Sequence, residues 1–464
     1  MFLCSPTFIL GFMPFAIILY WGLPKKYNIR NIFLIIAGLL FYSFGDAKYI
    51  LLFLMMACVT YVIGILIEKI ENKQGKRVII TLGCIVLVGV LGYFKYWNYI
   101  AINILSMKSL AGITMPLGIS FFTFKEISYI ADVYQNKIKA DRNILNVLVY
   151  ACYFPQIISG PISKYEEVIN QVQGATLSVE KIAKGFKRFS FGFFEKLVVA
   201  GVLGKFVDEV YALDSSDYSV FICLTVAICY SLQLFTDFAG YSSMSIGLSA
   251  MMGMDIKENF DYPFVAKSVS EFWRRWHISL STWFKDYVYI PLGGSRCSEF
   301  RTCVNKMVVF ILTGIWHGSS LTFLLWGFLH GVATTTEVVI KKRLPRVLSH
   351  IVTLIFVAVT FSIFRADSIG QAGHILKGMV TFTGLSTNAS AVMYGHFTLY
   401  FVVIVVLALL YCLPLQKAIY NSKVGVKYHK VITAIPYVVS VILLFICITK
   451  IAVADYSPFI YFKF

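Results

Sequence analysis

Charged residues are scarce in this sequence. Lys, Arg, Asp and Glu make up 14% of its 464 residues and apolar residues make up 58%, whereas an ordinary soluble domain has about 25% charged residues. Most helices therefore lack the polar face that a soluble helix shows to water. No polar block is long enough to fold alone, so we predict a single polytopic domain over residues 1–464, embedded in a lipid bilayer.

Acidic residues are scarcer than basic ones, 24 against 41, which leaves a net charge of +17. The basic residues form short clusters between apolar runs, as expected where positive residues hold the cytoplasmic ends of spanning helices, so we expect no nucleic-acid partner. Lys25, Lys26 and Arg30 follow the first apolar run, and a basic cluster at 68–77 follows the third. If these loops are cytoplasmic, the N-terminus is extracytoplasmic.

Long apolar runs recur along the whole chain and predict spanning helices. Lipid offers the backbone no hydrogen-bond partners, and a helix needs roughly 20 residues to cross. We therefore predict an all-α membrane bundle with about eleven crossings. The candidate spans are 3–22, 31–45, 49–67, 78–97, 114–133, 144–160, 191–212, 219–250, 305–340, 349–364, 397–414 and 431–453. Because 144–160 is short and 305–340 is too long for one span, some helices should be tilted, broken or re-entrant.

The sequence lacks the motifs of metal, redox and serine-nucleophile chemistry. Its ten cysteines lie mostly alone in apolar runs, without the CxxC spacing of zinc or redox sites. No GxSxG nucleophile motif occurs. We therefore expect no bound metal, no bound cofactor and no serine nucleophile.

Histidine is absent from the first 276 residues. The seven histidines are His277, His317, His330, His350, His374, His396 and His429. Because histidine alone has an ordinary pKa near neutrality, proton chemistry is expected in the C-terminal part of the chain. His330 is interpreted as a side chain that bonds a neighbouring helix.

His317, in the stretch LTGIWHGSS, is the strongest candidate for chemistry. Its segment has no charged residue between Lys306 and Glu337, and both flanks are basic. If both flanks are cytoplasmic, residues 305–340 form a hairpin or a broken helix whose turn places His317 inside the bilayer. An ionisable side chain there suggests a functional site, and burial favours the neutral imidazole that a general base needs. The alternative is a packing histidine.

A second constellation lies in EFWRRWHISLSTWFKDYVYIPLGG, residues 271–294. It mixes aromatic and ionisable side chains, namely Trp273, Arg274, Arg275, Trp276, His277, Lys285 and Asp286. Such mixing is typical of an anchor at the membrane interface. Arginines and a lysine beside aromatic rings also suit a phosphate-bearing donor, so both interpretations stay open.

Polar residues recur in the apolar stretch SLQLFTDFAGYSSMS, among them Gln233, Asp237, Tyr241, Ser242 and Ser243. A carboxylate such as that of Asp237 needs a partner in apolar surroundings. These side chains either line a cavity or hold helices together by hydrogen bonds.

These residues together resemble the membrane-bound O-acyltransferase family, in particular the bacterial branch that contains the membrane subunit of alginate O-acetylation and the D-alanyl transfer protein of teichoic acid modification. The resemblance rests on PLGISFFTFKEISYIADVY, YFPQIISGPISKYEE, LQLFTDFAGYSSMSIGLSAMMG, the long motif that ends in YIPLGG, and LTGIWHGSSLTFLLWGFLHG. One departure is FTDFAGYSSM, where Ala239 and Ser243 replace polar residues usual in alginate-type members.

The resemblance implies a bundle with re-entrant helices around a central tunnel. It implies that His317 is the essential residue and that His277 supports it. Donor binding and tunnel lining are assigned by resemblance to Trp273, Arg274, Arg275, Trp276, Lys285, Asp286 and Trp316. The implied donor is an acyl thioester, acetyl-CoA or a carrier-protein thioester, and the implied partners are an extracytoplasmic protein of the SGNH-hydrolase type and a glycan acceptor. The implied location is a bacterial inner membrane.

The sequence therefore predicts an O-acyltransferase that moves acetyl groups across the membrane for O-acetylation of a cell-envelope or exported polysaccharide. One alternative is D-alanyl transfer to teichoic acids from a carrier-protein thioester. Another is a transporter without enzymatic activity, which would also carry polar residues and broken helices at mid-membrane. A transporter of that kind would show two related halves, and no such internal repeat is visible.

Overall fold

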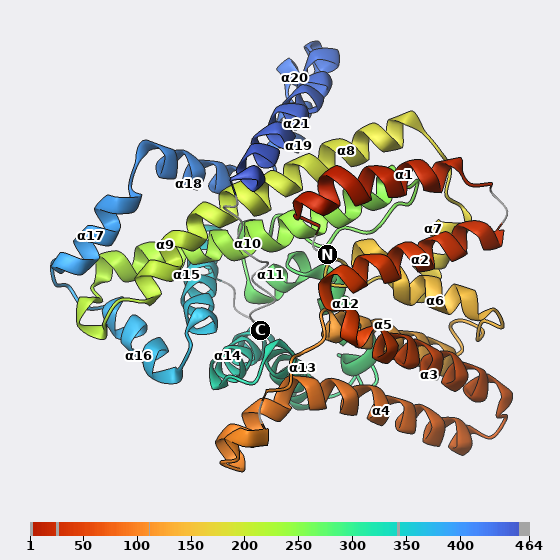
Figure 1. Ribbon diagram of the computed structural model, residues 1–464. Helices are drawn as coiled ribbons and strands as arrows, with labels where there is room; N and C mark the ends of the chain where they lie inside the picture. The colour runs from red at the N-terminus through yellow and green to blue at the C-terminus, as the bar shows by residue number, and fades with distance from the viewer. Residues whose placement is uncertain (1–2, 25–26, 111, 341–343, 454–464) are drawn as a thin grey trace. The chain divides into compact units, whose positions relative to one another are not determined.

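The computed structural model describes residues 3–24, 27–110, 112–340 and 344–453, and every regular element in these ranges is helical (Figure 1). The expected all-α class is thereby confirmed for the described residues. Lys25 and Lys26, on which the expected orientation partly depends, lie outside them, as do residues 341–343 of the second basic flank of His317. The contacts within the chain form two compact units, 1–189 with 241–258 and 190–240 with 259–464. The single domain over 1–464 stays a prediction.

The first unit consists of helices joined by short 3-10 and π turns. These helices are α1 (Met13–Gly22), α2 (Tyr27–Asp46), α3 (Ile50–Lys69), α4 (Lys73–Tyr99), α5 (Ile119–Tyr134), α6 (Ile144–Cys152), α7 (Tyr165–Gln173) and most of α8 (Val179–Phe194). Glycines let the helices approach closely, because a Cβ atom on Gly38 of α2 would collide with the carbonyl oxygen of Cys152 in α6. The expected span 144–160 is α-helical only as far as Cys152, and a 3-10 turn over Phe154–Gln156 follows, because Pro155 cannot continue the α-helical hydrogen bonds.

The second unit carries all seven histidines and most of the candidate site. Its helices are α9 (Gly201–Tyr211), most of α10 (Val220–Met251), α11 (Val269–Arg275), α12 (Ile278–Phe284), α13 (Glu299–His317), α14 (Leu321–Val339), α15 (Arg346–Arg365), α16 (Ile369–Gly378), α17 (Thr387–His396), α18 (Leu399–Tyr411), α19 (Leu415–Tyr420), α20 (Lys423–Lys427) and α21 (His429–Ala452). Two π-helical segments also belong to it, η6 (Glu195–Ala200) and η9 (Lys285–Tyr289).

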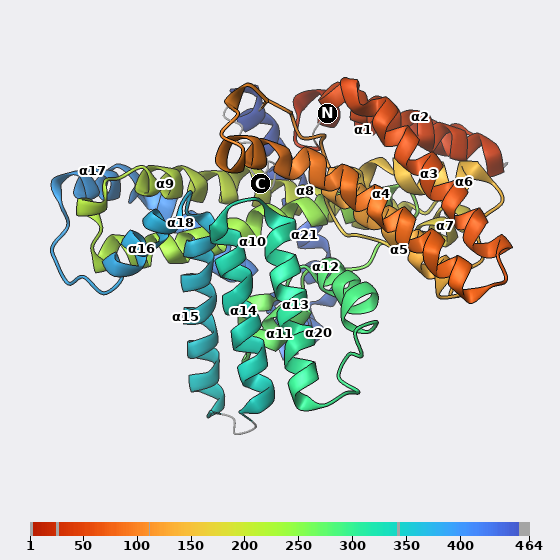
Figure 2. The same cartoon turned by 90° about the horizontal axis from the view of Figure 1, so that it is seen from below.

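The long segment 305–340 is broken, as expected, into the hairpin of α13 and α14. The break falls at Gly318, and Ser320 caps α14 by accepting a hydrogen bond from the backbone N–H of Thr322. The two helices touch backbone to backbone, because a Cβ atom on Gly314 would lie 2.5 Å from the carbonyl oxygen of Phe323. Figure 2 shows α13, α14 and α15 side by side.

Two ends of this unit can be recognised from contacts near the helix termini. At the first, the Glu337 carboxylate near the end of α14 accepts hydrogen bonds from the N–H groups of Val269 (2.6 Å) and Ser270 (3.1 Å). There Lys417, beyond α18, lies 3.6 Å from Asp261. We call this the basic end, because basic residues collect there: Lys267, Arg274, Arg275, Lys285, Arg301, Lys306, Arg346 and Lys417.

The opposite end is defined by contacts at the far terminus of α15. Arg365 lies 2.6 Å from Asp208 of α9, and the Tyr211 hydroxyl donates to the carbonyl oxygen of Ser362. Here Arg365 is offset by acidic neighbours, whereas the first end has an excess of basic side chains.

Several helices are apolar enough to cross a membrane. Among the described residues, five helical stretches are long and apolar enough to cross a membrane: Asn28–Lys69, Lys73–Ile104, Val220–Met251, Arg346–Arg365 and His429–Ala452. The helices α17 and α18, bent by 77°, would add a sixth if they form one broken span. The chain is thus consistent with a multi-pass membrane protein, while the count of about eleven crossings stays a prediction.

The close contact of α13 and α14 predicts a stability effect. In Gly327→Ala, the new methyl group would collide with the carbonyl oxygen of Phe310, so we expect a loss of about 1–3 kcal/mol. A lower melting temperature of the purified protein in detergent would show this loss. The control Gly373→Ala lies on α16 with no atom within 4 Å of the added Cβ, and it should leave stability unchanged or slightly higher. Equal melting temperatures of the two variants would contradict the proposed contact.

Candidate active site

His317 is the last residue of α13 and lies in an aromatic enclosure. Its side chain is buried, with 4% of the residue exposed. The centroid of its ring is 5.0 Å from that of Trp316, 5.2 Å from that of Trp326 and 5.0 Å from that of Phe364. Phe364 lies near the end of α15. The hairpin therefore extends from the basic end, and its turn lies near the opposite end. The enclosure keeps bulk water away from the imidazole.

One face of α13 connects this enclosure to the basic end. Lys306, Phe310, Thr313 and His317 follow one another at intervals of four, three and four residues, so their side chains lie above one another on the helix. The first three line a cavity of about 410 Å³. Its lining comprises Ser270, Trp273, Arg274, Ile278, Leu280, Ser281, Thr282, Phe284, Lys285, Tyr289, Ser295, Lys306, Val309, Phe310, Thr313 and Thr334. The lining reaches Thr313, one helical turn before His317.

We call the cavity of about 410 Å³ the donor cavity. Its mouth is basic. Arg274 and Lys285 are exposed and belong to α11 and η9. Lys306 lies on the facing helix, where its ammonium group donates a 3.1 Å hydrogen bond to the carbonyl oxygen of Thr334. Three basic side chains around one opening favour an anionic ligand, and hydrogen bonds between ammonium or guanidinium groups and phosphate are among the strongest in proteins.

The structure separates the residues of the motif 273–286 into two groups. Among the described residues, the cavity lining includes Trp273, Arg274 and Lys285 but not Arg275, Trp276 or Asp286. Arg275 instead pairs with Glu271 at 3.0 Å and with Asp261 at 3.1 Å. Trp276 stacks on Phe272 with ring centroids 5.3 Å apart, and Asp286 lies half-buried in η9. The two adjacent arginines therefore differ: Arg274 lines the cavity, and Arg275 forms ion pairs within the fold.

His330 fixes Trp273, as the sequence interpretation anticipated for a histidine that bonds neighbouring helices. The indole N–H of Trp273 donates to Nδ1 of His330 at 3.0 Å. Nδ1 is therefore an acceptor, so the neutral ring carries its proton on Nε2, which lies 3.1 Å from the hydroxyl oxygen of Thr360. Both ring nitrogens are used in joining α11, α14 and α15, which makes His330 a structural residue.

His277 occupies an unusual turn between α11 and α12. Its φ of 44° lies in the left-handed region, which is uncommon for residues other than glycine. Nδ1 lies 3.3 Å from Oδ1 of Asn259, and the same oxygen accepts hydrogen bonds from the Ser279 N–H and hydroxyl groups. Since Oδ1 is an acceptor, Nδ1 carries the proton and Nε2 presents its lone pair. Nε2 has no hydrogen-bond partner among the described residues.

Trp316 connects the two candidate histidines. Its ring centroid is 6.4 Å from that of His277 and 5.0 Å from that of His317. Burial lowers the pKa of His277 to about 3, so this imidazole stays neutral at physiological pH. A group with so low a pKa is a weak base, and the geometry is that of a side chain that positions Trp316 and the turn beside it.

Of the polar residues of α10 noted in the sequence, Asp237, Tyr241 and Ser242 are buried and Gln233 is half-buried, and their surroundings differ. Asp237 pairs with Lys196 of η6, and both are almost fully buried. Gln233 packs against Gly204 of α9, where a Cβ atom would lie 2.7 Å from the amide nitrogen of Gln233. Tyr241 and Ser242 are buried in the other unit. Asp237 thus has the partner that a carboxylate requires in apolar surroundings, and its contact joins helices.

Several lining residues of the donor cavity were not anticipated from the sequence. They include Lys306, Ser281, Thr282, Tyr289, Ser295, Thr313 and Thr334. Lys306 carried a detectable signal, because it is a lone cation at the start of a long apolar run. Asn259, the partner of His277, carried none, because 18 residues separate the two and only the fold brings them together.

The low pKa of His277 predicts a pH dependence of stability. The unfolded chain takes up a proton below pH 6.5, the ordinary value, and the folded chain only near pH 3. Stability present above pH 6.5 is therefore lost as the pH falls, by about 2 kcal/mol between pH 7 and pH 5. His277→Asn removes this titration, and asparagine tolerates the left-handed turn. The melting temperature of the variant should fall less between these pH values than that of the wild type.

A matched variant controls for the loss of a histidine. His374→Asn changes an exposed residue of α16 and should keep the pH slope of the wild type. Parallel curves for His277→Asn and the wild type would show that the imidazole is not held neutral by burial.

Comparison with known proteins identifies the family. The family model described as MBOAT, membrane-bound O-acyltransferase family, matches residues 39–369. The chain is 36% identical over 392 residues to the probable alginate O-acetylase AlgI of Pseudomonas aeruginosa, covering 82% of this chain and 74% of that protein. It is 32% identical over 424 residues to the peptidoglycan O-acetyltransferase of Helicobacter pylori, covering 82% and 80%.

A more distant likeness covers about half of the chain. Identity to the teichoic acid D-alanyltransferase of Bacillus subtilis is 30% over 270 residues, which covers 53% of this chain and 68% of that protein. The matched family model includes the α13–α14 hairpin and the motif around His277. The chain therefore belongs to the membrane-bound O-acyltransferase family and is an acyltransferase.

Proposed function

We propose that this acyltransferase takes acetyl groups from acetyl-CoA in the cytoplasm and passes them across the membrane for O-acetylation of a cell-envelope or exported polysaccharide. The observation that carries the proposal is the single face of α13 that leads from the basic mouth of the donor cavity to His317. The names of the alginate and peptidoglycan relatives supply the acetyl group and the class of acceptor.

The donor enters from the basic end. An excess of Lys and Arg marks cytoplasmic segments in membrane proteins, so the basic end of the second unit faces the cytoplasm. Arg274, Lys285 and Lys306 would bind the phosphates of coenzyme A, while the acyl arm lies along α13. The distance along the helix from Lys306 to His317 is about 16 Å at 1.5 Å per residue.

The reaction needs an acceptor hydroxyl at His317. The hydroxyl oxygen attacks the thioester carbonyl, a C–O bond forms and the C–S bond breaks. His317 accepts the hydroxyl proton and returns it to the leaving thiolate, or else it orients the thioester while the proton passes directly. The aromatic enclosure limits hydrolysis of the thioester by excluding water. The hairpin brings donor and acceptor together, because the donor arrives along α13 from the basic end and the acceptor meets it at His317.

His277 supports this arrangement without exchanging a proton. Its ring is neutral and held by Asn259, and it contacts Trp316, which contacts His317. A change in His277 would therefore displace Trp316 and alter the position of the reacting groups.

The acceptor side lies at the opposite end, outside the inner membrane of a bacterium, with the N-terminus also extracytoplasmic. We propose that an extracytoplasmic partner of the SGNH-hydrolase type takes the acetyl group there and transfers it to the glycan. The neighbouring reading frames test this point. A secreted SGNH-like protein beside polysaccharide genes is the expected finding, and its absence would favour direct transfer to the glycan.

D-alanyl transfer to teichoic acids is the second candidate. The likeness to the teichoic acid D-alanyltransferase over 53% of this chain favours it. In D-alanyl transfer, a carrier-protein thioester would bind at the mouth of the donor cavity. Mass analysis of envelope glycans from a deletion strain separates the two, because loss of an acetyl group supports the first proposal and loss of D-alanine the second.

Replacing His317 should remove activity. His317→Gln keeps much of the side-chain volume, and we expect glycan acetylation to fall by about 10²- to 10⁴-fold, the usual contribution of general acid–base catalysis. Acetyl groups on glycans from complemented deletion cells give the measurement, with the amount of membrane protein determined in parallel. The control His374→Gln changes an exposed histidine and should leave acetylation intact. Full acetylation with His317→Gln would remove the catalytic assignment.

Replacing the basic residues at the mouth should weaken donor use. For Arg274→Gln and for Lys285→Gln, we expect KM for acetyl-CoA to rise about fivefold with little change in kcat, since an exposed charge contact contributes about 1 kcal/mol. The control Lys267→Gln removes an exposed charge at the same end that does not line the cavity among the described residues. Unchanged KM values for Arg274→Gln and Lys285→Gln would contradict donor binding and favour the interpretation of residues 271–294 as an anchor at the membrane interface.

A further inference from the structure

Trp326 of α14 carries a buried indole N–H group that the contacts within the chain do not use. The residue is 1% exposed, and its N–H has no hydrogen-bond acceptor among the described residues. By contrast, the indole N–H of Trp273 donates to His330, and that of Trp97 donates to the carbonyl oxygen of Leu110. A buried hydrogen-bond donor without an acceptor is costly, so the acceptor for Trp326 is expected to be an atom of a ligand.

Trp326 lies between the donor cavity and His317. Its ring centroid is 5.5 Å from that of Trp273, which lines the cavity, and 5.2 Å from that of His317. The indole also packs against His330, with ring centroids 4.9 Å apart. Both nitrogens of His330 are engaged by Trp273 and Thr360. The indole therefore borders the path by which an acyl arm in the donor cavity would reach His317.

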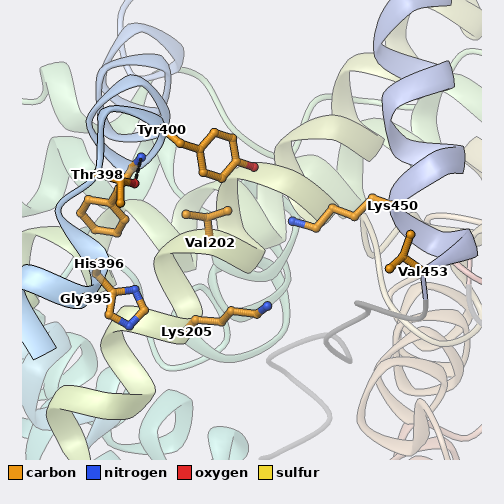
Figure 3. Close-up of a pocket in the computed structure, with 9 residues that line it drawn as sticks. Val202, Lys205, Gly395, His396, Thr398, Tyr400, Lys450 and Val453 are labelled. Atoms are coloured by element: carbon orange, nitrogen blue, oxygen red, sulfur yellow. Dashed lines mark hydrogen bonds between the residues drawn. The ribbon is translucent and has the colours of Figure 1, made fainter.

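Another cavity of the same unit is separate from this path. It has a volume of about 450 Å³, and its lining includes Lys205 of α9, His396 of α17 and Lys450 of α21 (Figure 3). None of its described lining residues belongs to α13 or α14. The donor cavity, whose lining includes Phe310 and Thr313 of α13, is therefore the one that leads toward Trp326.

Acyl transfer creates negative charge on the carbonyl oxygen of the thioester. As the acceptor hydroxyl attacks the carbonyl carbon, the electron pair of the C=O bond moves onto this oxygen, and it returns when the C–S bond breaks. In a dry enclosure the charged oxygen needs a hydrogen-bond donor. Of the rings around His317, Phe364 has no N–H group, Trp316 also contacts His277, and Trp326 contacts the wall of the cavity.

We propose that the indole N–H of Trp326 donates a hydrogen bond to the carbonyl oxygen of the acetyl thioester and stabilises the negative charge that forms there during the attack. This inference rests on the proposed transfer from acetyl-CoA at His317. The hydrogen bond strengthens as the charge develops, so it lowers the barrier more than it tightens binding of acetyl-CoA.

Trp326→Phe tests the role of the N–H group, because it removes this group and keeps an aromatic ring. We expect the initial rate of glycan acetylation in complemented deletion cells to fall by about 10²-fold, the usual effect of losing one such hydrogen-bond donor, at an equal amount of membrane protein. The control Trp97→Phe removes an indole N–H in the other unit and should keep the wild-type rate. An unchanged rate with Trp326→Phe would overturn the proposal.

Two stable analogues of acetyl-CoA separate hydrogen bonding from packing. The amide analogue, in which NH replaces the sulfur atom, keeps the carbonyl group, whereas S-ethyl-CoA has a CH₂ group in its place. In the full-length protein purified in detergent, Trp326→Phe should weaken binding of the amide analogue about fivefold, as expected for one hydrogen bond, and leave the Kd of S-ethyl-CoA unchanged. Equal losses for the two analogues would show a packing role and overturn the proposal.

A second variant keeps the test independent of a folding defect in the first. Trp326→His retains an N–H group on an aromatic ring and should acetylate faster than Trp326→Phe, and equal rates would contradict the proposal. The wild type separates this inference from the proposed function. If Trp326 has no part in the chemistry, the wild type still binds both analogues and acetylates glycans, whereas a wild type that binds neither analogue would overturn the proposed acetyl-CoA donor and this inference with it.

Discussion

The direct backbone contact between α13 and α14 is the constraint on which the site depends. Gly314 and Gly327 face the other helix where no side chain would fit, so the two backbones pack directly against each other. The contact forces the chain to turn within three residues after His317. The imidazole is therefore carried on a rigid hairpin and surrounded by Trp316, Trp326 and Phe364.

Buried polar groups around this hairpin occur in specific pairs, because an unsatisfied polar group in an apolar interior is costly. The Trp273–His330 bond fixes a wall of the donor cavity, and the His277–Asn259 contact fixes which ring nitrogen carries the proton. The three buried histidines thus have different surroundings. His330 bonds Trp273 of α11 and Thr360 of α15, His277 contacts Asn259, and His317 lies in the aromatic enclosure at the end of α13.

The distribution of charge gives the second unit a direction. Basic residues surround the donor mouth, while Arg365 at the opposite end is balanced by Asp208. An excess of basic side chains favours anionic ligands at the first end, and the hairpin extends from there to the level of Phe364.

Composition and periodicity determined the all-α class, the break within 305–340 and the choice of His317, because these depend on local hydrophobicity and on charges close in the sequence. The motif match determined the family. Only the tertiary structure decided that Arg274 lines the cavity while Arg275 pairs with Glu271 and Asp261, since neighbouring residues of a helix point in different directions. It also decided the partner of His277 and the lining of the donor cavity, because these are made by residues far apart in the chain, and a linear pattern holds no information on which helices pack together.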